Sequence, residues 1–151
     1  MGLMHRSSPC VGICSTTYGD LICRGCKRFA HEIVGWNGFA PGQRDAVWLR
    51  LAELRQGSVG DFLRVADAGD LTSRAEQLRV PDFAELDELD LAYEVLRRSR
   101  VPVAELAAVG IEVLVRDAAV VAAADVVRLI DDEFFRRSRA HYERNYRIAA
   151  Q

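Results

Sequence analysis

Apolar residues recur at spacings of three and four along most of the 151-residue chain, which predicts a mainly α-helical protein. A first short helix is expected around Phe29, Ile33 and Trp36. A second short helix is expected from Pro41 to about Gln56. Proline suits the first turn of a helix, because its missing N–H would have no partner there, and the following Gly57 is typical of a helix end.

Helical spacing continues through the rest of the chain. Shorter helices are expected at residues 58–66, 71–78, 82–99 and 103–109, the last of them ended by Gly110. A long helix is expected from Ala118 to about Ile148, with Asp117 as its N-cap. Its heptad-like apolar stripe contains Val120, Val127 and Phe134. Residues 111–115 are apolar and β-branched, which is typical of a strand, but the sequence offers no evident partner strand.

Cysteine usage divides the chain into two predicted domains. All four cysteines fall within residues 10–26, and the rest of the chain contains none. A segment of about 57 residues buries little apolar surface by itself, so a bound metal contributes most to folding there. We therefore expect a metal-binding module with two short helices at residues 1–57. A helical domain is expected at residues 58–151, ending in the long C-terminal helix.

The cysteines have the spacing C-x3-C-x8-C-x2-C and are Cys10, Cys14, Cys23 and Cys26. Four soft thiolates on one short loop suit a single tetrahedral metal ion or a small iron–sulfur cluster. Three cations, those of Arg24, Lys27 and Arg28, follow closely and would offset the negative charge of such a site. Two disulfides or four unligated thiols are the alternative interpretations.

The start of the chain bears on the choice between metal and disulfides. Residues 1–9 have no apolar core typical of a secretory signal, and no apolar run is long enough to span a bilayer. We therefore expect a cytoplasmic protein without a membrane segment. In a reducing cytosol, clustered cysteines indicate metal or redox chemistry rather than disulfides.

The spacing of the cysteines also bears on which metal is bound. Structural zinc sites commonly have two to four residues between paired cysteines, as this chain does. The spacing is not one of the standard ferredoxin runs, so by itself it favours zinc over an iron–sulfur cluster.

The cysteine segment resembles a small bacterial family catalogued as domain of unknown function 1289, whose members are often labelled predicted iron–sulfur proteins. The resemblance covers about residues 8–55 and rests on Ser8-Pro9-Cys10-x-Gly12-x-Cys14, Cys23-x-Gly25-Cys26-x-Arg28, Glu32-Ile33-x-x-Trp36, Arg44, Val47 and Leu51. It implies a metal-binding role for the four cysteines and no known reaction. Because the family label favours iron–sulfur where the spacing favours zinc, the two cofactors stand about level.

The chain departs from the family pattern at two places. Leu21 stands where the family usually has glycine, two residues before the third cysteine, and the turn glycine is Gly19 instead. The second helix opens with Ala40-Pro41-Gly42-Gln43, where the family usually has a Ser-x-x-Glu capping box. An alanine cap cannot accept from first-turn amides, which costs about 1 kcal/mol and makes the start of this helix less defined.

Charge is spread unevenly along the chain. The net charge is −2 overall, with +3 in residues 1–60 and −5 in residues 61–151. The whole chain is therefore not a typical electrostatic nucleic-acid binder. Basic and aromatic residues do interleave near the C-terminus, where RNA, DNA or an anionic partner could bind, although a solvated helix end is favoured: Arg136, Arg137, Arg139, His141, Tyr142, Arg144, Tyr146 and Arg147.

The remaining candidates have simple structural interpretations. Trp36 and Trp48 are expected to form a small core that holds the cysteine loop against the two helices. His31 is expected to be an exposed helix residue rather than a further metal ligand. The acidic run of residues 82–90 is expected to favour a helix start rather than to bind a cation. The chain has no nucleophile–base pair, phosphate loop or dinucleotide motif, so no catalytic residue is assigned and an enzyme is disfavoured.

Together these patterns predict a cytosolic metal-binding accessory or adaptor protein that presents its four-cysteine module to a protein partner. An iron–sulfur electron carrier or maturation factor, and a nucleic-acid-binding zinc-knuckle protein, are the rival functions. A helix of some thirty residues would extend about 45 Å, longer than a body of this size covers. A homodimer through the C-terminal helix is therefore expected, with Phe135, Tyr142 and Tyr146 packed on the second copy or on another protein.

Overall fold

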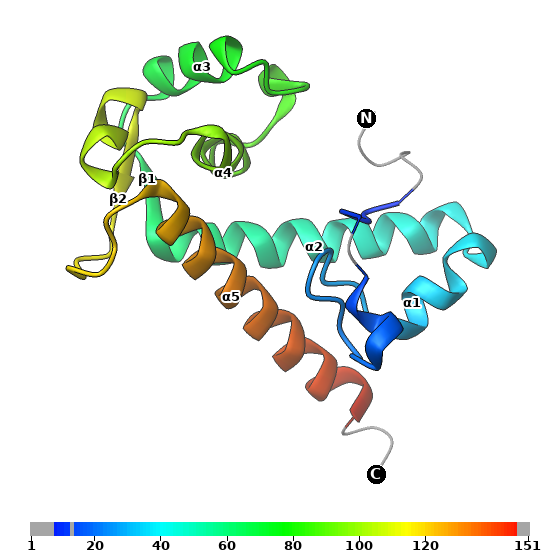
Figure 1. The fold of residues 1–151 in the computed structure, drawn as a ribbon. Coiled ribbons are helices and arrows are strands. Elements are labelled where there is room, and N and C mark those ends of the chain that lie inside the picture. Colours follow the sequence, from blue (N-terminus) through cyan, green and yellow to red (C-terminus); the bar gives the residue numbers. More distant parts are fainter. Residues whose placement is uncertain (1–7, 13, 148–151) are drawn as a thin grey trace. The chain divides into compact units, whose positions relative to one another are not determined.

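The computed structural model describes residues 8–12 and 14–147 (Figure 1), and it is mainly α-helical as predicted. The chain forms two compact units. Unit 1 contains residues 1–55 and 134–151, and unit 2 contains residues 56–133. The predicted division assigned everything after residue 57 to one domain, whereas here the segment from Phe134 onward is grouped with the cysteine module. Among the described residues, no helix has the length and apolar character needed to cross a bilayer.

Unit 1 is built around two helical segments next to the cysteine loop. Its elements are a 3-10 turn at Ser15–Tyr18, α1 at Ala30–Gly35, a 3-10 turn at Trp36–Gly38, the first part of α2 (Pro41–Phe62), the end of α5 (Ala123–Tyr142) and a π-helical turn at Glu143–Arg147. The buried core of the unit consists of Trp36, Val47, Leu51 and Phe134, with Trp48 partly buried against them. The predicted packing role of the two tryptophans is therefore confirmed.

The start of α2 is defined despite its alanine cap. The helix begins at Pro41, and the carbonyl of Ala40 accepts from the amides of Gln43 and Arg44 at 2.9 and 3.1 Å. The Gln43 side chain reaches back and accepts from the Ala40 N–H at 2.8 Å. Half of a capping box is thus present, because the glutamine supplies the return bond although the cap residue has no side-chain oxygen.

The predicted end of α2 at Gly57 is wrong, because the helix continues to Phe62. A glycine inside a helix costs about 1 kcal/mol relative to alanine. The next residues, Ser58 and Val59, are fully buried, and Val59 belongs to the core of unit 2. Burying one valine is worth about 1.5 kcal/mol or more, so packing of the following turn outweighs the cost of Gly57.

The sequence left open whether residues 111–115 form a strand, and the structure shows that they contain one, with its partner where a helix was expected. Leu63–Val65 forms β1 and pairs antiparallel with β2 at Ile111–Val113. In this register Arg64 lies opposite Glu112, and the two side chains form an ion pair. Leu63 and Ile111 are buried in the core of unit 2, which explains why a segment with helical spacing is extended.

Unit 2 also contains two helices, α3 and α4, that are each capped at the N-terminus by an aspartate. α3 spans Ala68–Gln77, and the Asp67 carboxylate accepts from the Asp70 amide at 2.9 Å. α4 spans Glu88–Arg98, and the Asp87 carboxylate accepts from the Leu89 amide at 2.9 Å. A 3-10 turn at Phe83–Glu85 separates the two helices. The predicted starts, at residues 71 and 82, were misplaced because these Asx caps were not recognised.

The long helix starts later than predicted. α5 begins at Ala123, whereas Asp117 accepts from the Ala119 amide at 2.9 Å and closes a turn. The carboxylate of Asp125 instead accepts from the amides that precede α5. The predicted end at Ile148 lies outside the described residues; the last described turn is π-helical.

Gly110 ends the 3-10 helix Val103–Val109, as predicted, at φ +84°. A Cβ at this position would lie 2.2 Å from the backbone oxygen of Asp67 and 3.0 Å from the amide nitrogen of Leu71. We expect Gly110→Ala to lower the free energy of unfolding of unit 2 by about 3 kcal/mol, because it adds a left-handed alanine and a backbone clash. Urea denaturation followed by circular dichroism measures this loss.

Gly60→Ala is the matched control for that substitution. Gly60 lies within α2, and its added Cβ would make only an ordinary contact, 3.5 Å from a Leu89 methyl group. Alanine should therefore leave unit 2 as stable or raise its stability by up to about 1 kcal/mol. Equal losses in the two variants would contradict the assigned role of Gly110.

Candidate metal centre

The second cysteine pair lies on a tight reversal of the chain. Ile22 forms an antiparallel bridge with Phe29, and the amide of Cys23 donates to the carbonyl of Arg28 at 2.9 Å. The amide of Lys27 donates in turn to the carbonyl of Cys23, also at 2.9 Å. These bonds fix a short knuckle that carries Cys23 and Cys26, and both cysteines are buried.

Backbone amides are directed at the Cys23 sulfur. Burial by itself would raise the pKa of this thiol, but hydrogen bonds from the backbone N–H groups of Cys26, Ser15 and Gly25 outweigh it and lower the pKa to about 7. The side chain of Cys26 adds a further hydrogen bond. Amide donors that stabilise a thiolate in this way are the same donors that a metal-bound sulfur uses. The surroundings of Cys23 therefore favour the thiolate, which is the form that binds a metal.

Cys26 has a different environment. Burial raises the pKa of this thiol, while the guanidinium of Arg28 opposes the rise by donating from Nε to Sγ at 3.3 Å. Arg28 is itself buried and lies over the Trp36 ring, with 4.9 Å between the guanidinium carbon and the ring centroid. The arginine thus joins the cysteine knuckle to the core of unit 1.

Lys27 is the least expected residue of the knuckle. It adopts φ +69°, in the left-handed region that favours glycine, and only 1% of it is exposed. Its ammonium group donates to the carbonyls of Arg24 and Gly25 at 2.5 and 3.0 Å and lies 5.3 Å from the centre of the Phe134 ring. The buried positive charge of Lys27 therefore lies against the backbone of the loop that carries Cys23 and Cys26.

The first cysteine pair is more open. Cys14 is half-buried, and the Thr16 hydroxyl lies 2.9 Å from its sulfur; this contact lowers the pKa of the thiol against the opposing effects of burial and of the charge of Cys23. Cys10 is exposed, and its sulfur accepts from the Gly12 amide at 3.4 Å. Cys14, Cys23 and Cys26 thus share one neighbourhood, whereas Cys10 remains at the surface. Within residues 8–12 and 14–147, no three His, Cys, Asp or Glu side chains are arranged to hold a metal ion.

The donor set nevertheless fits a thiolate-bound metal. The second pair of sulfurs is in hydrogen-bonding contact and surrounded by amide donors, and buried cations of Lys27 and Arg28 lie beside it. A four-thiolate site needs such cations, because a divalent ion leaves it with a formal charge of about −2. Closing the site requires the sulfurs of Cys10 and Cys14 to approach this pair.

A buried ion pair next to the loop was not predicted from the sequence. The Glu32 side chain is 5% exposed, and its Oε1 accepts from the Phe29 amide at 2.8 Å and from Arg50 Nη2 at 2.7 Å. The guanidinium of Arg50 also bonds the second carboxylate oxygen and lies 4.1 Å from the centre of the Phe29 ring. Glu32 was part of the family pattern, but nothing in the sequence indicated Arg50, which lies 18 residues away on α2.

Phe29 is also the centre of an aromatic cluster. His141 stacks on its ring at 6.1 Å between centroids, and Tyr142 and Tyr146 meet it edge-on at 5.0 and 5.5 Å. His31 is exposed, as predicted, and lies 5.0 Å from the Tyr146 ring. The two tyrosines were expected to pack on a second copy or on another protein, but here they pack on a ring of their own unit. The homodimer stays a prediction without that argument.

His141 gives unit 1 a specific pH dependence. Burial lowers the pKa of its imidazole, and the charges of Arg50 and Arg144 lower it further, against the opposing charge of Glu32. Between pH 7 and pH 5 the unfolded chain therefore takes up a proton that the folded unit resists, so stability falls as the pH is lowered. We expect His141→Gln to flatten this fall, as measured by urea denaturation at several pH values. An unchanged slope in the variant would contradict the assignment.

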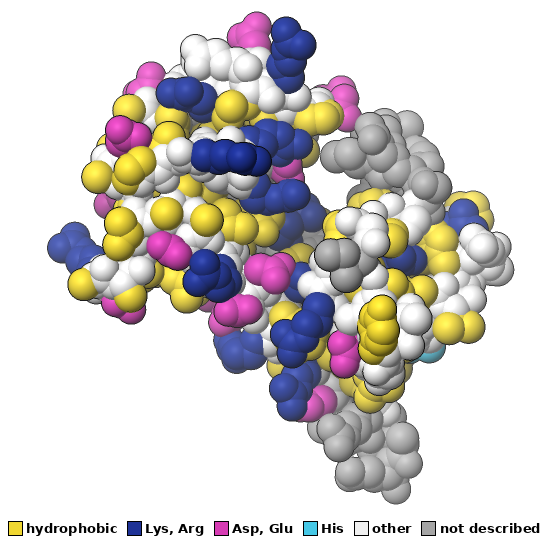
Figure 2. All heavy atoms as spheres, viewed as in Figure 1, with side chains coloured by type: hydrophobic (Ala, Val, Ile, Leu, Met, Phe, Trp, Pro, Cys, Tyr) yellow, Lys and Arg dark blue, Asp and Glu magenta, His cyan; other side chains and the backbone are white. Residues whose placement is uncertain are grey.

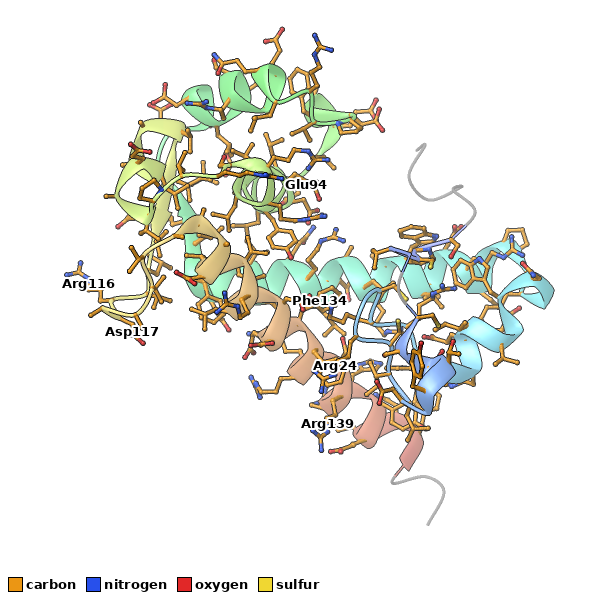
Figure 3. The ribbon with its side chains drawn as sticks, in the orientation of Figure 1. Arg24, Glu94, Arg116, Asp117, Phe134 and Arg139 are labelled. Atoms are coloured by element: carbon orange, nitrogen blue, oxygen red, sulfur yellow. The ribbon has the colours of Figure 1, made fainter. Side chains whose placement is uncertain are left out.

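Charge separates sharply between the two units. Unit 1 holds 12 Lys and Arg against five Asp and Glu, a net of +7, and unit 2 holds eight against 17, a net of −9. Figure 3 shows Arg24 and Arg139 in unit 1, where both line a hollow of about 310 Å³ together with Phe135 and Tyr142. Arg24 lies over the Phe135 ring, 4.2 Å from its centre. This contrast in charge is not apparent from the sequence, because the basic C-terminal segment is far along the chain from the cysteine module with which it is grouped.

Comparison with known families agrees with the sequence resemblance. Residues 8–55 match the family described as "Protein of unknown function (DUF1289)", which confirms the resemblance over about a third of the chain. The matched segment contains all four cysteines, α1 and most of α2. No curated protein and no solved structure matches the chain.

Proposed function

We propose that unit 1 is a metal-stapled module that holds one zinc ion or one small iron–sulfur cluster on Cys10, Cys14, Cys23 and Cys26. In this proposal the protein acts as an accessory or adaptor that presents the module to a protein partner. The observation that carries the proposal is the Cys23 environment, where three backbone amides lower the thiol pKa to about 7 despite burial. An ordinary buried cysteine is inert, and its pKa is raised instead.

The surrounding residues support a thiolate site. Lys27 and Arg28 are buried and positively charged, so they offset the negative charge of metal-bound sulfur. The Nε–H of Arg28 donates directly to the sulfur of Cys26 and orients it. A bound zinc ion would cross-link the two halves of the loop, and an iron–sulfur cluster would add electron transfer.

The adaptor role is supported by apolar side chains on the cysteine loop. Val11 is 63% exposed, Tyr18 is 89% exposed and Leu21 is 56% exposed, and all three lie between or next to the cysteine pairs. Tyrosine and aliphatic side chains left in water on a loop are typical anchors for a protein partner. Charge on the same unit, a net of +7, favours a partner with an acidic surface.

Metal analysis of protein purified without air tests the proposal. We expect about one zinc per chain, or iron and acid-labile sulfide in matched amounts with a brown colour, because thiolate-bound iron absorbs visible light and zinc does not. A reversible loss of the visible band on reduction would favour the electron-carrier function. Reduced protein that carries neither metal would overturn the proposal.

Nucleic-acid binding by unit 1 is the second candidate function, and the net charge of +7 favours it. Arg24 and Arg139 share a hollow with two aromatic rings, which suits a phosphate next to a stacked base, although Asp20 and Glu143 also line the hollow and Arg139 pairs with Glu143 at 3.6 Å. Binding of single-stranded RNA or DNA that weakens steeply with salt, and that Arg139→Gln reduces, would support this function over the adaptor role.

A further inference from the structure

We propose that unit 2 binds an acidic peptide segment with apolar anchor residues, in an arginine-lined groove at the C-terminal end of α4. The groove consists of two hollows of about 630 and 500 Å³. Ser99, Arg100 and Val101 line both hollows, so the two hollows adjoin at this short segment. Every residue that lines the groove belongs to unit 2, so peptide binding there does not depend on the metal proposed for unit 1.

The floor of the groove is apolar. The larger hollow is lined by Leu96, Val101, Pro102, Val121 and Val127. Leu78, Ala104, Ala108 and Val109 line the smaller one. Val121 is 63% exposed, so the larger hollow leaves an aliphatic side chain in water. Hollows of this size and lining accommodate apolar groups, and each can take a side chain of a bound peptide.

The rim of the groove is positively charged, although unit 2 as a whole is acidic. Four of the eight arginines of unit 2 line the two hollows, namely Arg74, Arg97, Arg98 and Arg100. Glu105 is the one acidic residue in either lining. Figure 2 shows basic side chains gathered over the part of unit 2 that holds α3 and α4, with apolar side chains between them. In a unit with 17 acidic residues, this local excess of positive charge marks the groove.

The four arginines differ in whether their side chains already have a polar partner. Arg97 and Arg98 both pair with Glu94 on α4. The side chains of Arg74 and Arg100, by contrast, have no hydrogen bond or ion pair with any residue that the structure describes. An unpaired guanidinium offers a planar pair of donors that matches a carboxylate. Arg100 lines both hollows, so a carboxylate bound there would lie between two apolar anchors.

The surroundings favour an acidic peptide over a nucleic acid. The net charge of unit 2 is −9, which opposes the continuous charge of a phosphate backbone. No aromatic side chain lines either hollow, so bases would have no ring to stack on. A peptide needs only one or two carboxylates close to the arginines, and at physiological salt the screening length of about 8 Å limits repulsion from distant acids.

Fluorescence anisotropy with a labelled synthetic peptide tests the inference. The probe is a short capped peptide in which glutamates flank two leucines. Two control peptides replace the glutamates by lysines or the leucines by serines. We expect saturable binding of the probe to the full-length protein, and binding about tenfold weaker or more for each control, because each removes one half of the recognition.

Variants locate the binding site. The double substitution Arg74→Gln and Arg100→Gln should weaken the probe about tenfold or more without affecting the fold, since neither side chain has a partner to lose. Val121→Glu should weaken it by placing a negative charge in the larger hollow. Arg116→Gln is the matched control, because this exposed arginine lies on the loop after β2 (Figure 3), lines neither hollow and should change binding less than twofold.

Three results would overturn the inference. They are no saturable binding of the probe, equal losses in the Arg74/Arg100 and Arg116 variants, and tighter binding of the lysine peptide than of the probe. Binding of a single-stranded RNA that the Arg74/Arg100 variant abolishes would also overturn it, because the arginines would then recognise phosphate.

Discussion

Changing Cys23 to serine is expected to release the metal and to remove most of the stability of unit 1, a loss of about 5 kcal/mol or more. For so small a unit, the free energy of metal binding is folding free energy, and apparent values for structural zinc reach about 10–16 kcal/mol. Cys23 should be more sensitive than Cys10, because it is buried and accepts three amide hydrogen bonds while Cys10 is exposed. Metal content and urea denaturation measure the two losses.

Tryptophan fluorescence isolates the effect on unit 1. Both tryptophans of the chain, Trp36 and Trp48, lie in this unit, so their emission follows its unfolding. Wild-type protein stripped with a chelator is the control and should melt like Cys23→Ser. Unit 2 contains no cysteine, and its transition by circular dichroism should be unchanged. Identical melting of loaded wild type, stripped wild type and Cys23→Ser would contradict a metal staple.

Glu32→Ala is expected to lower the free energy of unfolding of unit 1 by about 3–5 kcal/mol. The substitution leaves the guanidinium of Arg50 buried without its counter-ion, and removing one partner of a buried ion pair costs this much. Arg50 is poorly placed to find another partner: its side chain is 13% exposed, and its Nε already has no hydrogen-bond partner among the described residues. The Phe29 amide also loses its acceptor.

Two further variants separate the ion pair from general effects of substitution. Glu53→Ala removes an exposed glutamate from α2 and should change stability by less than about 0.5 kcal/mol. The double variant Glu32→Ala with Arg50→Met should be more stable than Glu32→Ala alone, because it removes the orphaned charge. If the double variant instead loses the sum of the two single effects, the pair is not coupled as the structure indicates.

Local signals in the sequence were sufficient for much of the fold. The spacing of Phe29, Trp36 and the later apolar residues predicted the helices, and Gly110 was identified as the end of the 3-10 helix. These features depend on neighbours within a few residues, such as helical periodicity or a left-handed glycine. The helix starts were less accurate, because Asp67 and Asp87 cap helices from positions that apolar spacing does not mark.

Long-range packing decided the elements that were predicted wrongly. Gly57 is typical of a helix end, yet α2 continues beyond it to Phe62 because Val59 is buried in the core of unit 2. Residues after Phe62 have helical spacing, yet the pairing of Leu63 with Val113 makes them a strand. In both cases a contact with a distant segment outweighs a local preference of about 1 kcal/mol.

The sequence alone determined which side chains are the candidate metal ligands, because four cysteines on one loop are recognisable from spacing, and it determined a mainly helical fold. Only the tertiary structure decided their surroundings: the amides at Cys23, the buried charge of Lys27 and the Glu32–Arg50 pair next to the loop. It also decided the grouping of the basic C-terminal segment with the cysteine module, which separates charges of +7 and −9. Burial, hydrogen-bond direction and charge proximity depend on contacts between residues far apart in the chain, and spacing along a sequence does not encode them.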